Sequence, residues 1–286
     1  MGKESKRVGE VGEQFDEASG RVARSPWIER LARCGYAAKG VVYIVAGALA
    51  VLAALGEGGE VTDARGAMRS IARQPFGGAM LGVVAFGLLA YVLWRWVQAI
   101  TDADGKGREL KGVALRAGYF GSGVVYAGLS VSAARILFGA YNDGEPSAAQ
   151  SWTARVMSLP LGAWLVSLAG LAVIGFGVYQ LYKAYSAKFR KRLKLSDMSE
   201  RARKMATLSG RVGYAARGTI FIVVGVLLMR AARTYNPAHA RGLDGAPQLL
   251  ARTPFGHYLL LAVAAGLAAY GGYTLVEARY RRIAGS

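Results

Sequence analysis

The hydrophobic residues of this chain gather in six long segments that polar sequence separates. The segments hold almost no charged residues and reach 20–27 residues with their flanks; their cores are 41–55, 79–94, 124–140, 161–182, 219–232 and 258–276. A helix needs about 20 residues to cross a hydrocarbon core of roughly 30 Å. Because the segments are continuously apolar rather than alternating, helices are favoured over barrel strands. The pattern predicts six transmembrane helices.

A soluble protein with six buried helices is the competing interpretation. A helix at the surface of a soluble protein needs a polar face, and residues 41–55 (VVYIVAGALAVLAAL) offer none. The apolar fraction of 53% and the mean hydropathy of +0.26 also argue for a membrane protein.

A motif occurs three times along the chain. Each copy opens with an arginine, a glycine and a tyrosine, and a second glycine follows five residues after the first. The openings are Arg33-Cys34-Gly35-Tyr36, Arg116-Ala117-Gly118-Tyr119 and Arg211-Val212-Gly213-Tyr214. A proline motif follows 40, 42 and 41 residues after the first glycine, at Pro75, Pro160 and Pro254. This constant spacing indicates tandem repeats.

Each repeat contains two predicted spans, so all three repeats enter the membrane in the same orientation. An axis along the membrane normal then relates them, which predicts an all-α membrane protein with six helices in a pseudo-threefold bundle. Inverted-repeat transporters need the opposite relationship. The segments are a polar leader at 1–26, repeat 1 at 27–104, repeat 2 at 105–190 and repeat 3 at 191–286, which begins with a basic linker.

The loop inside each repeat predicts a short helix at the outer membrane interface. These helices are expected at 63–73, 147–158 and 244–252. The proline that follows is expected in the first turn of the returning helix, where its missing N–H costs nothing. The glycine two residues later is expected to let that turn pack closely.

Positive charge is distributed unevenly between the two sides of the predicted membrane. The segments before the first span, between spans two and three, between spans four and five, and after span six carry 23 Lys and Arg residues, whereas the other three loops carry 6. The positive-inside rule places both termini in the cytoplasm. This topology accounts for much of the net charge of +18, so nucleic acid is not an expected partner.

Residues that carry chemistry are scarce. The chain has two histidines and one cysteine, Cys34, and the spans contain no Asp or Glu except Glu277. No paired cysteines or histidine motif stands at a plausible site. We therefore expect no cofactor, no metal and no enzymatic activity. Proton- or cation-coupled transport is also disfavoured, because it usually needs carboxylates at the bilayer midplane.

Arginines within the spans are the strongest candidate binding residues. Arg135 and Arg230 both lie seventeen residues after the first glycine of their repeat, where repeat 1 has Leu52. With no carboxylate nearby, an arginine would contact backbone carbonyls, lipid phosphate or an anionic ligand. The candidate anion- or lipid-binding set is Arg135, Arg230, Arg233 and Arg95.

A second set of cations lies near the cytoplasmic ends of the first helices. Its members are expected to anchor the helices at the interface by binding lipid headgroups: Arg33, Arg116, Arg211, Lys39 and Arg217. The returning helices carry aromatic residues at matched offsets from the proline: Tyr91, Phe176 and Tyr270, then Trp94, Tyr179 and Tyr273. An aromatic belt at the interface is the first interpretation, and a ligand cage is the alternative.

These motifs resemble a bacterial membrane family known as domain of unknown function 1206. The shared pattern begins with R-x-G-Y. Three residues after the tyrosine comes Lys, Ser or Arg, which is followed directly by Gly, and a P-F-G or P-L-G motif follows later in the repeat. The resemblance covers residues 30–283; the second repeat departs from it at Leu159-Pro160-Leu161, where the other repeats have phenylalanine after the proline. It implies the three-repeat architecture and a bacterial plasma membrane, but no activity.

Three functions compete at this point. The first is a non-enzymatic scaffold or accessory protein that binds anionic lipid, another membrane protein or a second copy of itself. The second is a transporter or channel for a small anionic or apolar solute through the pseudo-threefold centre. Mitochondrial-type carriers also have three two-helix repeats, but their P-x-(D/E)-x-x-(K/R) signature is missing here. The third is a lipid-modifying enzyme.

Overall fold

Six long helices dominate the fold. The computed structural model describes residues 25–55, 64–101, 109–140, 148–240 and 256–282. Within these ranges the long helices are α2 (Pro26–Leu55), α4 (Gly77–Ile100), α5 (Leu110–Leu137), α7 (Gly162–Ser186), α8 (Glu200–Arg233) and α10 (Gly256–Tyr280). By length and composition all six could cross a membrane. The six predicted spans are confirmed as apolar helices, which indicate a multi-pass membrane protein.

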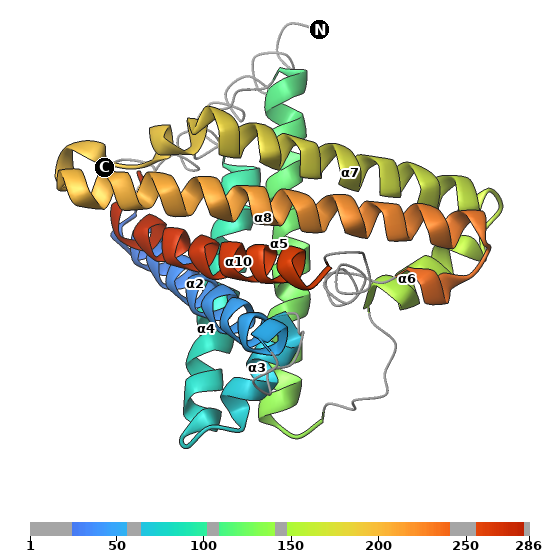
Figure 1. Ribbon diagram of the computed structural model, residues 1–286, viewed down its shortest axis with the longest axis horizontal. Helices are drawn as coiled ribbons and strands as arrows, with labels where there is room; N and C mark the ends of the chain where they lie inside the picture. The colour runs from blue at the N-terminus through green and yellow to red at the C-terminus, as the bar shows by residue number, and fades with distance from the viewer. Residues whose placement is uncertain (1–24, 56–63, 102–108, 141–147, 241–255, 283–286) are drawn as a thin grey trace, which may run out of the picture.

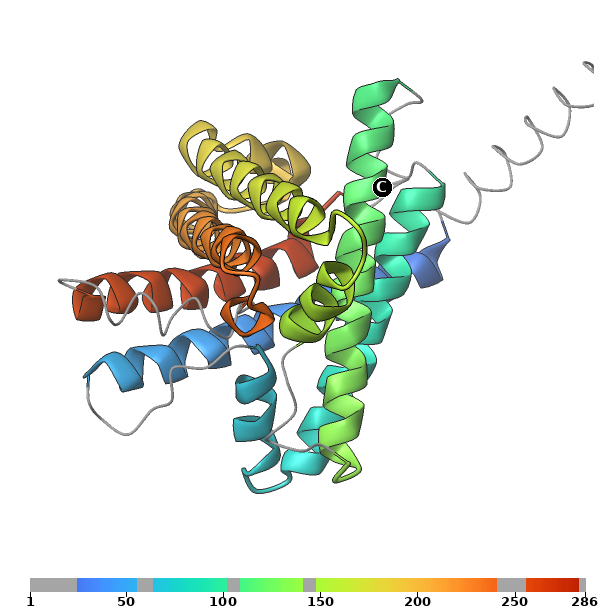
Figure 2. The same cartoon turned by 90° about the vertical axis from the view of Figure 1, so that its right-hand side faces the viewer.

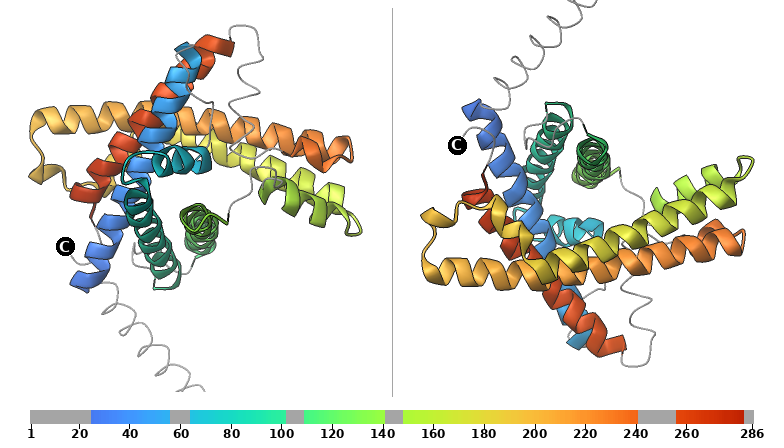
Figure 3. Two further views of the ribbon diagram at one scale, coloured as in Figure 1. Left: turned by 90° about the horizontal axis from the view of Figure 1, so that it is seen from below. Right: turned by 90° about the horizontal axis from the view of Figure 1, so that it is seen from above.

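The helices pair between repeats rather than only within them. The most extensive contacts join α7 to α8, α10 to α2 and α4 to α5, so each pair takes one helix from each of two repeats. The three pairs run in different directions about a common centre (Figures 1 and 2). Because α10 packs on α2, the third repeat closes on the first, as the views from below and above also show (Figure 3). The three repeats therefore surround one centre, as predicted.

Glycines let the paired helices approach closely. A Cβ built on Gly40 would lie 2.9 Å from the carbonyl oxygen of Gly271 on α10, and one built on Gly218 would lie 2.9 Å from the carbonyl oxygen of Gly177 on α7. Gly40 and Gly218 occupy the same position in repeats 1 and 3. Small residues have this role in membrane helices, where hydrocarbon gives helices no hydrophobic reason to associate.

The second repeat is more open than the other two. In repeats 1 and 3 the first glycine faces the returning helix of its own repeat, because a Cβ on Gly35 or Gly213 would lie 2.6 or 2.5 Å from backbone or Cβ atoms of Tyr91 or Tyr270. The equivalent Gly118 has no atom within 4 Å of that point. Correspondingly, α5 and α7 make few contacts, whereas α2 packs on α4 and α8 packs on α10.

The returning helices begin after the proline rather than at it. Phe76 and Leu161 precede α4 and α7 as N-caps with left-handed backbones, each with a φ of 61°. The amide of Gly77 donates to the carbonyl of Gln74 at 2.8 Å, which closes a turn around Pro75. The prediction that proline occupies the first helical turn is therefore wrong in repeats 1 and 2. Pro254 lies outside the described residues.

The glycine after each of these turns is held against the preceding short helix. A Cβ on Gly77 would lie 2.4 Å from the carbonyl oxygen of Ile71, so the close packing expected here is confirmed. The preceding helices are α3 (Ala64–Ala72) and α6 (Ala148–Met157), as predicted. The third predicted short helix, at 244–252, lies outside the described residues, as do residues 1–24 of the leader.

Candidate anion-binding cavity

The centre of the bundle contains two adjoining cavities. Their volumes are about 290 Å³ and 260 Å³, and we call them the cationic cavity and the apolar cavity after their linings. All three repeats contribute to both of them. The two cavities share six lining residues: Lys39, Gly118, Ser122, Tyr126, Phe176 and Arg217. Together they fall in the range of small-molecule sites, roughly 300–1,000 Å³.

The cationic cavity has a large excess of positive charge. Among its described lining residues Glu277 is the one carboxylate, and its Oε1 accepts a hydrogen bond from Arg281 Nη1 at 3.0 Å, with both side chains buried. The six cationic side chains that line the cavity are Lys39, Arg95, Lys183, Arg192, Arg217 and Arg281. Burying positive charge is costly unless an opposite charge or hydrogen-bond acceptors compensate it. This lining favours an anion.

Lys39 lies at the middle of this lining, in a cage of tyrosines. It is 3% exposed, and its Nζ lies 4.8–5.9 Å from the ring centroids of Tyr43, Tyr91, Tyr126 and Tyr270. The same nitrogen donates to the hydroxyls of Tyr91 at 3.1 Å and Tyr270 at 3.2 Å. Ring faces and hydroxyl oxygens thus stabilise the ammonium group, and its charge is not cancelled by a carboxylate.

Two tyrosine hydroxyls connect Lys39 to an arginine on either side. Arg95 Nε donates to the Tyr91 hydroxyl at 2.8 Å, and Arg217 Nη1 donates to the Tyr270 hydroxyl at 2.6 Å. Each hydroxyl therefore accepts from two cations, which uses both of its lone pairs. Three cations are held at fixed positions by neutral groups, so their charge remains available to a ligand.

Matched repeat positions bring these groups together. Lys39 and Arg217 are equivalent positions of repeats 1 and 3, and Tyr91 and Tyr270 are equivalent positions on the returning helices. Repeat 2 has Ser122 and Phe176 at the two positions, so it supplies neither the cation nor the hydroxyl. The hydrogen-bonded cations at this junction therefore come from repeats 1 and 3, whereas repeat 2 adds Tyr126 and Lys183 to the lining and provides the open side.

Part of the wall of the cationic cavity comes from the segment between α7 and α8. Here the short 3-10 helix η1 (Lys188–Arg192) carries Arg192, whose Nη2 donates to the Tyr119 hydroxyl at 3.4 Å. Backbone bonds from Lys194 to Tyr280 at 2.7 Å and from Arg282 to Arg192 at 2.8 Å tie this segment to the end of α10. The basic linker thus contributes to the site itself.

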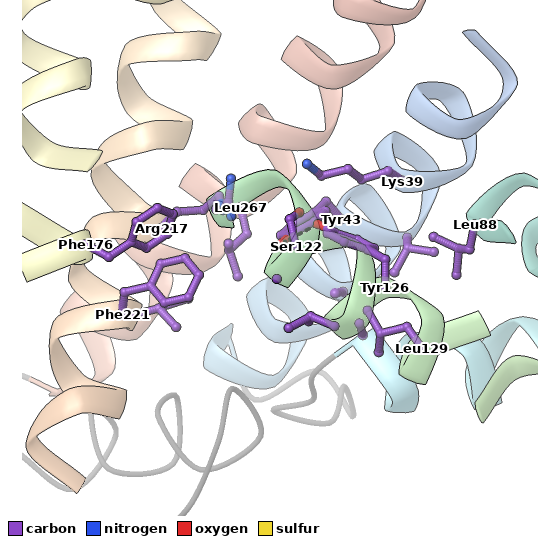
Figure 4. A pocket seen from close by; sticks show the side chains of 17 residues that line it. Lys39, Tyr43, Leu88, Ser122, Tyr126, Leu129, Phe176, Arg217, Phe221 and Leu267 are labelled. Atoms are coloured by element: carbon purple, nitrogen blue, oxygen red, sulfur yellow. Dashed lines mark hydrogen bonds between the residues drawn. The ribbon is translucent and has the colours of Figure 1, made fainter. Parts of the chain in front are cut away.

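The apolar cavity extends from the same cations toward the other end of the bundle. On α2 it continues from Lys39 to Val42 and Ala46, and on α5 from Ser122 to Leu129. In Figure 4, Lys39 and Arg217 reach toward one another from opposite sides of the pocket, and Leu129 lies farther along it. Seven residues of helix correspond to about 10 Å. The combined space is therefore polar at one end and hydrocarbon-like at the other.

Comparison with known proteins identifies the family. A family model described as Domain of Unknown Function (DUF1206) matches residues 34–102, 117–187 and 212–281, one match for each repeat. The chain belongs to this family. It is also 37% identical over 258 residues to "Uncharacterized protein YxxB" of Bacillus subtilis (strain 168), covering 90% of this chain and 93% of that protein. No solved structure matches the chain.

Of the four arginines first singled out for anion binding in this DUF1206 chain, one lines either of the two described cavities. Arg95 is half-buried in the cationic cavity. Arg135 is exposed in the last turn of α5, and Arg230 and Arg233 are exposed in the last turn of α8. None of these three lines either cavity, so the structure offers them no shared site at the bundle centre.

The arginine of the repeat motif caps a neighbouring helix in two repeats. Arg33 Nη1 donates to the carbonyl of Ala278 at 2.8 Å and to that of Arg279, at the end of α10. Arg116 Nε and Nη2 donate to the carbonyls of Ala99 at 2.7 Å and Ile100 at 2.8 Å, at the end of α4. These carbonyls have no partner within their own helix. Arg211, the third copy, is exposed.

The aromatic belt is the wrong interpretation for four of the six aromatics at matched offsets on the returning helices. Tyr91, Trp94, Tyr270 and Tyr273 are buried inside the bundle, and Tyr91 and Tyr270 form part of the cage around Lys39. No site was assigned from the sequence to Gln98, Lys183 and Glu277, which are polar at one shared offset from the proline. Lys183 and Glu277 line the cationic cavity, and this matched polar position was the available signal.

Metal binding finds no support in the described part of the chain, which brings together no group of three or more His, Cys, Asp or Glu side chains. The described lining of the two cavities contains neither histidine nor cysteine. The chemistry on offer is hydrogen-bond donation and positive charge.

Proposed function

We propose that this DUF1206 protein is a non-enzymatic membrane protein that binds a ligand carrying a phosphate or carboxylate group in the cationic cavity. The observation that carries this proposal is the described lining, in which six cations stand against one carboxylate, itself paired with Arg281. Phosphate and carboxylate are the groups that arginine and lysine bind most strongly.

The cations are arranged so that a bound anion would form hydrogen bonds with side chains that are already ordered. Lys39 and Arg217 lie at the junction of the two cavities and are fixed by tyrosine hydroxyls. An anion placed there would accept charge-assisted hydrogen bonds, each worth about 1.5–3 kcal/mol. Because the side chains are already ordered by the cage, binding would cost little side-chain entropy.

We further propose that the protein lies in the bacterial plasma membrane with both termini in the cytoplasm. The distribution of 23 against 6 basic residues supports this orientation. The cationic cavity would then lie nearer the cytoplasmic face, since Arg192 and Arg281 at its wall belong to segments beyond the helix ends on that side.

Transport of a small anion is the second candidate, and the contact between the two cavities favours it. A path from the cationic cavity into the apolar cavity would lead toward the opposite side of the membrane. Liposome flux separates the two functions. A binding protein retains its ligand without net movement, whereas a transporter releases trapped phosphate from protein-containing vesicles.

The binding proposal is tested by ligand-induced stabilisation of the purified protein in a neutral detergent. Sodium phosphate is compared with sodium chloride at equal ionic strength, and dioleoylphosphatidylglycerol with dioleoylphosphatidylcholine. An anionic ligand at 100 times its Kd stabilises the folded state by about 2.7 kcal/mol, which raises the unfolding temperature. If neither phosphate nor the anionic lipid raises it above its matched control, the proposal fails.

A further inference from the structure

We infer that the ligand of the cationic cavity is an anionic lipid that reaches it sideways from the membrane, between α5 and α7. This inference rests on the proposed function and adds the ligand class and the route. It starts from the seam of the second repeat, which we define by Gly118, Gly121 and Phe176. These residues lie on α5 and α7, which make few contacts with each other.

The seam leads directly into the binding space. Gly118 and Phe176 line both cavities, and Gly121 lines the apolar cavity. All three residues are exposed, and a Cβ on either glycine would meet no atom within 4 Å. The matching places in repeats 1 and 3 are closed, because Gly35 and Gly213 contact the backbones of Tyr91 and Tyr270. One side of the bundle is therefore open at the level of the cations.

The two helices that form the opening determine whether it faces lipid or water. Both α5 and α7 are long and apolar enough to cross a membrane, so a gap between them faces lipid rather than water. Large apolar side chains of the two helices are exposed as well, among them Val125 on α5 and Leu168 on α7. A ligand that approaches through this gap must itself be soluble in the membrane.

The two cavities match the two chemical parts of such a ligand, a charged headgroup and part of an acyl chain. The cations hold the headgroup, and the apolar cavity begins where they end and continues along α2, α5 and α8 past Ala46, Leu129 and Ile220. A free anion such as inorganic phosphate would occupy only the cationic end. An anionic lipid fills both parts, placing one charged group on Lys39 and Arg217 and an acyl chain against the hydrocarbon-like wall.

The experiment fills the opening at the seam with a larger side chain and measures how much lipid the protein retains. Gly118→Leu and Gly121→Leu place a large side chain in the opening. Gly128→Leu is the matched control, because Gly128 is on the same helix, is also exposed and would place its Cβ with no atom within 4 Å, but lines neither cavity. The full chain is reconstituted in nanodiscs of dioleoylphosphatidylglycerol and dioleoylphosphatidylcholine and then extracted. Retained lipid is identified and counted by native mass spectrometry.

We expect the wild type and Gly128→Leu to retain phosphatidylglycerol in preference to phosphatidylcholine, and both seam variants to retain on the order of tenfold less. Thermal stabilisation by sodium phosphate is measured in parallel. It shows whether each variant is folded and whether its cations still bind an anion, independently of the seam. If the wild type binds phosphate but retains no anionic lipid, or if the seam variants retain as much as Gly128→Leu, this inference is wrong and the proposed function stands. If the wild type binds neither phosphate nor lipid, the proposed function itself fails.

Discussion

Lys39 and Arg217 donate hydrogen bonds to the same oxygen, the hydroxyl of Tyr270, at 3.2 and 2.6 Å. The two cations come from equivalent positions of the first and third repeats, so internal duplication has placed two like charges beside one acceptor. Two positive charges that share one acceptor oxygen repel each other. A neutral hydroxyl offsets only part of that repulsion, and a bound anion would remove the rest.

Tyr270→Phe tests the acceptor that the two cations share. The substitution removes one hydroxyl that accepts two charge-assisted bonds, so we expect a loss of about 1.5–3 kcal/mol in the stability of the ligand-free protein. Tyr185→Phe, at an exposed position of α7, is the control and should change stability by less than about 0.5 kcal/mol. Unfolding temperature in neutral detergent measures both. Equal effects of the two variants would contradict the role assigned to Tyr270.

Glycine substitutions test the difference between the repeats. Gly35→Ala forces a Cβ to 2.6 Å from the backbone of Tyr91, and such overpacking costs about 1–3 kcal/mol. Gly118→Ala enters open space and should be neutral or stabilising by up to about 1 kcal/mol, because alanine favours the helix. Comparable destabilisation of both variants would mean that α5 and α7 pack as closely as α2 and α4.

Helix capping by the motif arginine is tested by Arg33→Gln. The variant loses the bonds to the carbonyls of Ala278 and Arg279 and the pairing with Glu29, and we expect it to lower stability by about 1–2 kcal/mol. Arg211→Gln removes the same motif residue at an exposed position and should have an effect of less than about 0.5 kcal/mol. The measurement compares the unfolding temperatures of the two variants with that of the wild type. A cost at Arg211 as large as that at Arg33 would favour the anchoring function expected of all three arginines.

Glu277→Gln separates the stability of the empty site from its affinity for an anion. Breaking the buried pair with Arg281 is expected to destabilise the ligand-free protein by about 3–5 kcal/mol. The cavity loses its one described carboxylate, so phosphate should stabilise this variant more than it stabilises the wild type. Glu200→Gln, which breaks a solvent-exposed pair with Lys204, serves as the control. A variant that is destabilised but gains nothing from phosphate would argue against a ligand in this cavity.

The sequence predicted the helices and the repeats well because both depend on local pattern. The apolar runs and the glycine-to-proline spacing were enough to place the six long helices and the short helices α3 and α6. The pairing of α2 with α10 was not predictable, since a glycine such as Gly40 indicates a close contact without indicating its partner. The opening in repeat 2 was missed for the same reason, because Gly118 looks identical to Gly35 in sequence.

The candidate site was harder to predict, because hydropathy reports which residues a segment contains and not which way their side chains point. The apolar run begins at residue 41, so Lys39 appeared to lie at the membrane interface, whereas α2 begins at Pro26 and places Lys39 well inside the helix. Arg135 showed the opposite pattern: apolar sequence follows it, but it lies in the last turn of α5 and is exposed. Which face of a helix meets the centre depends on the partner helices.

The most direct test of an anion site compares two double variants that each remove two positive charges. Lys39→Met with Arg217→Met changes the junction of the cavities, and Arg230→Gln with Arg233→Gln changes the exposed end of α8. The measurement is the affinity of detergent-solubilised protein for dioleoylphosphatidylglycerol.

We predict that the central variant loses at least about 100-fold in affinity, because two charge-assisted bonds of about 1.5–3 kcal/mol each are removed. The peripheral variant should change less than about threefold, since exposed charges are screened. Equal losses in the two variants, or no loss in the central one, would contradict the assignment of the cavity as an anion site.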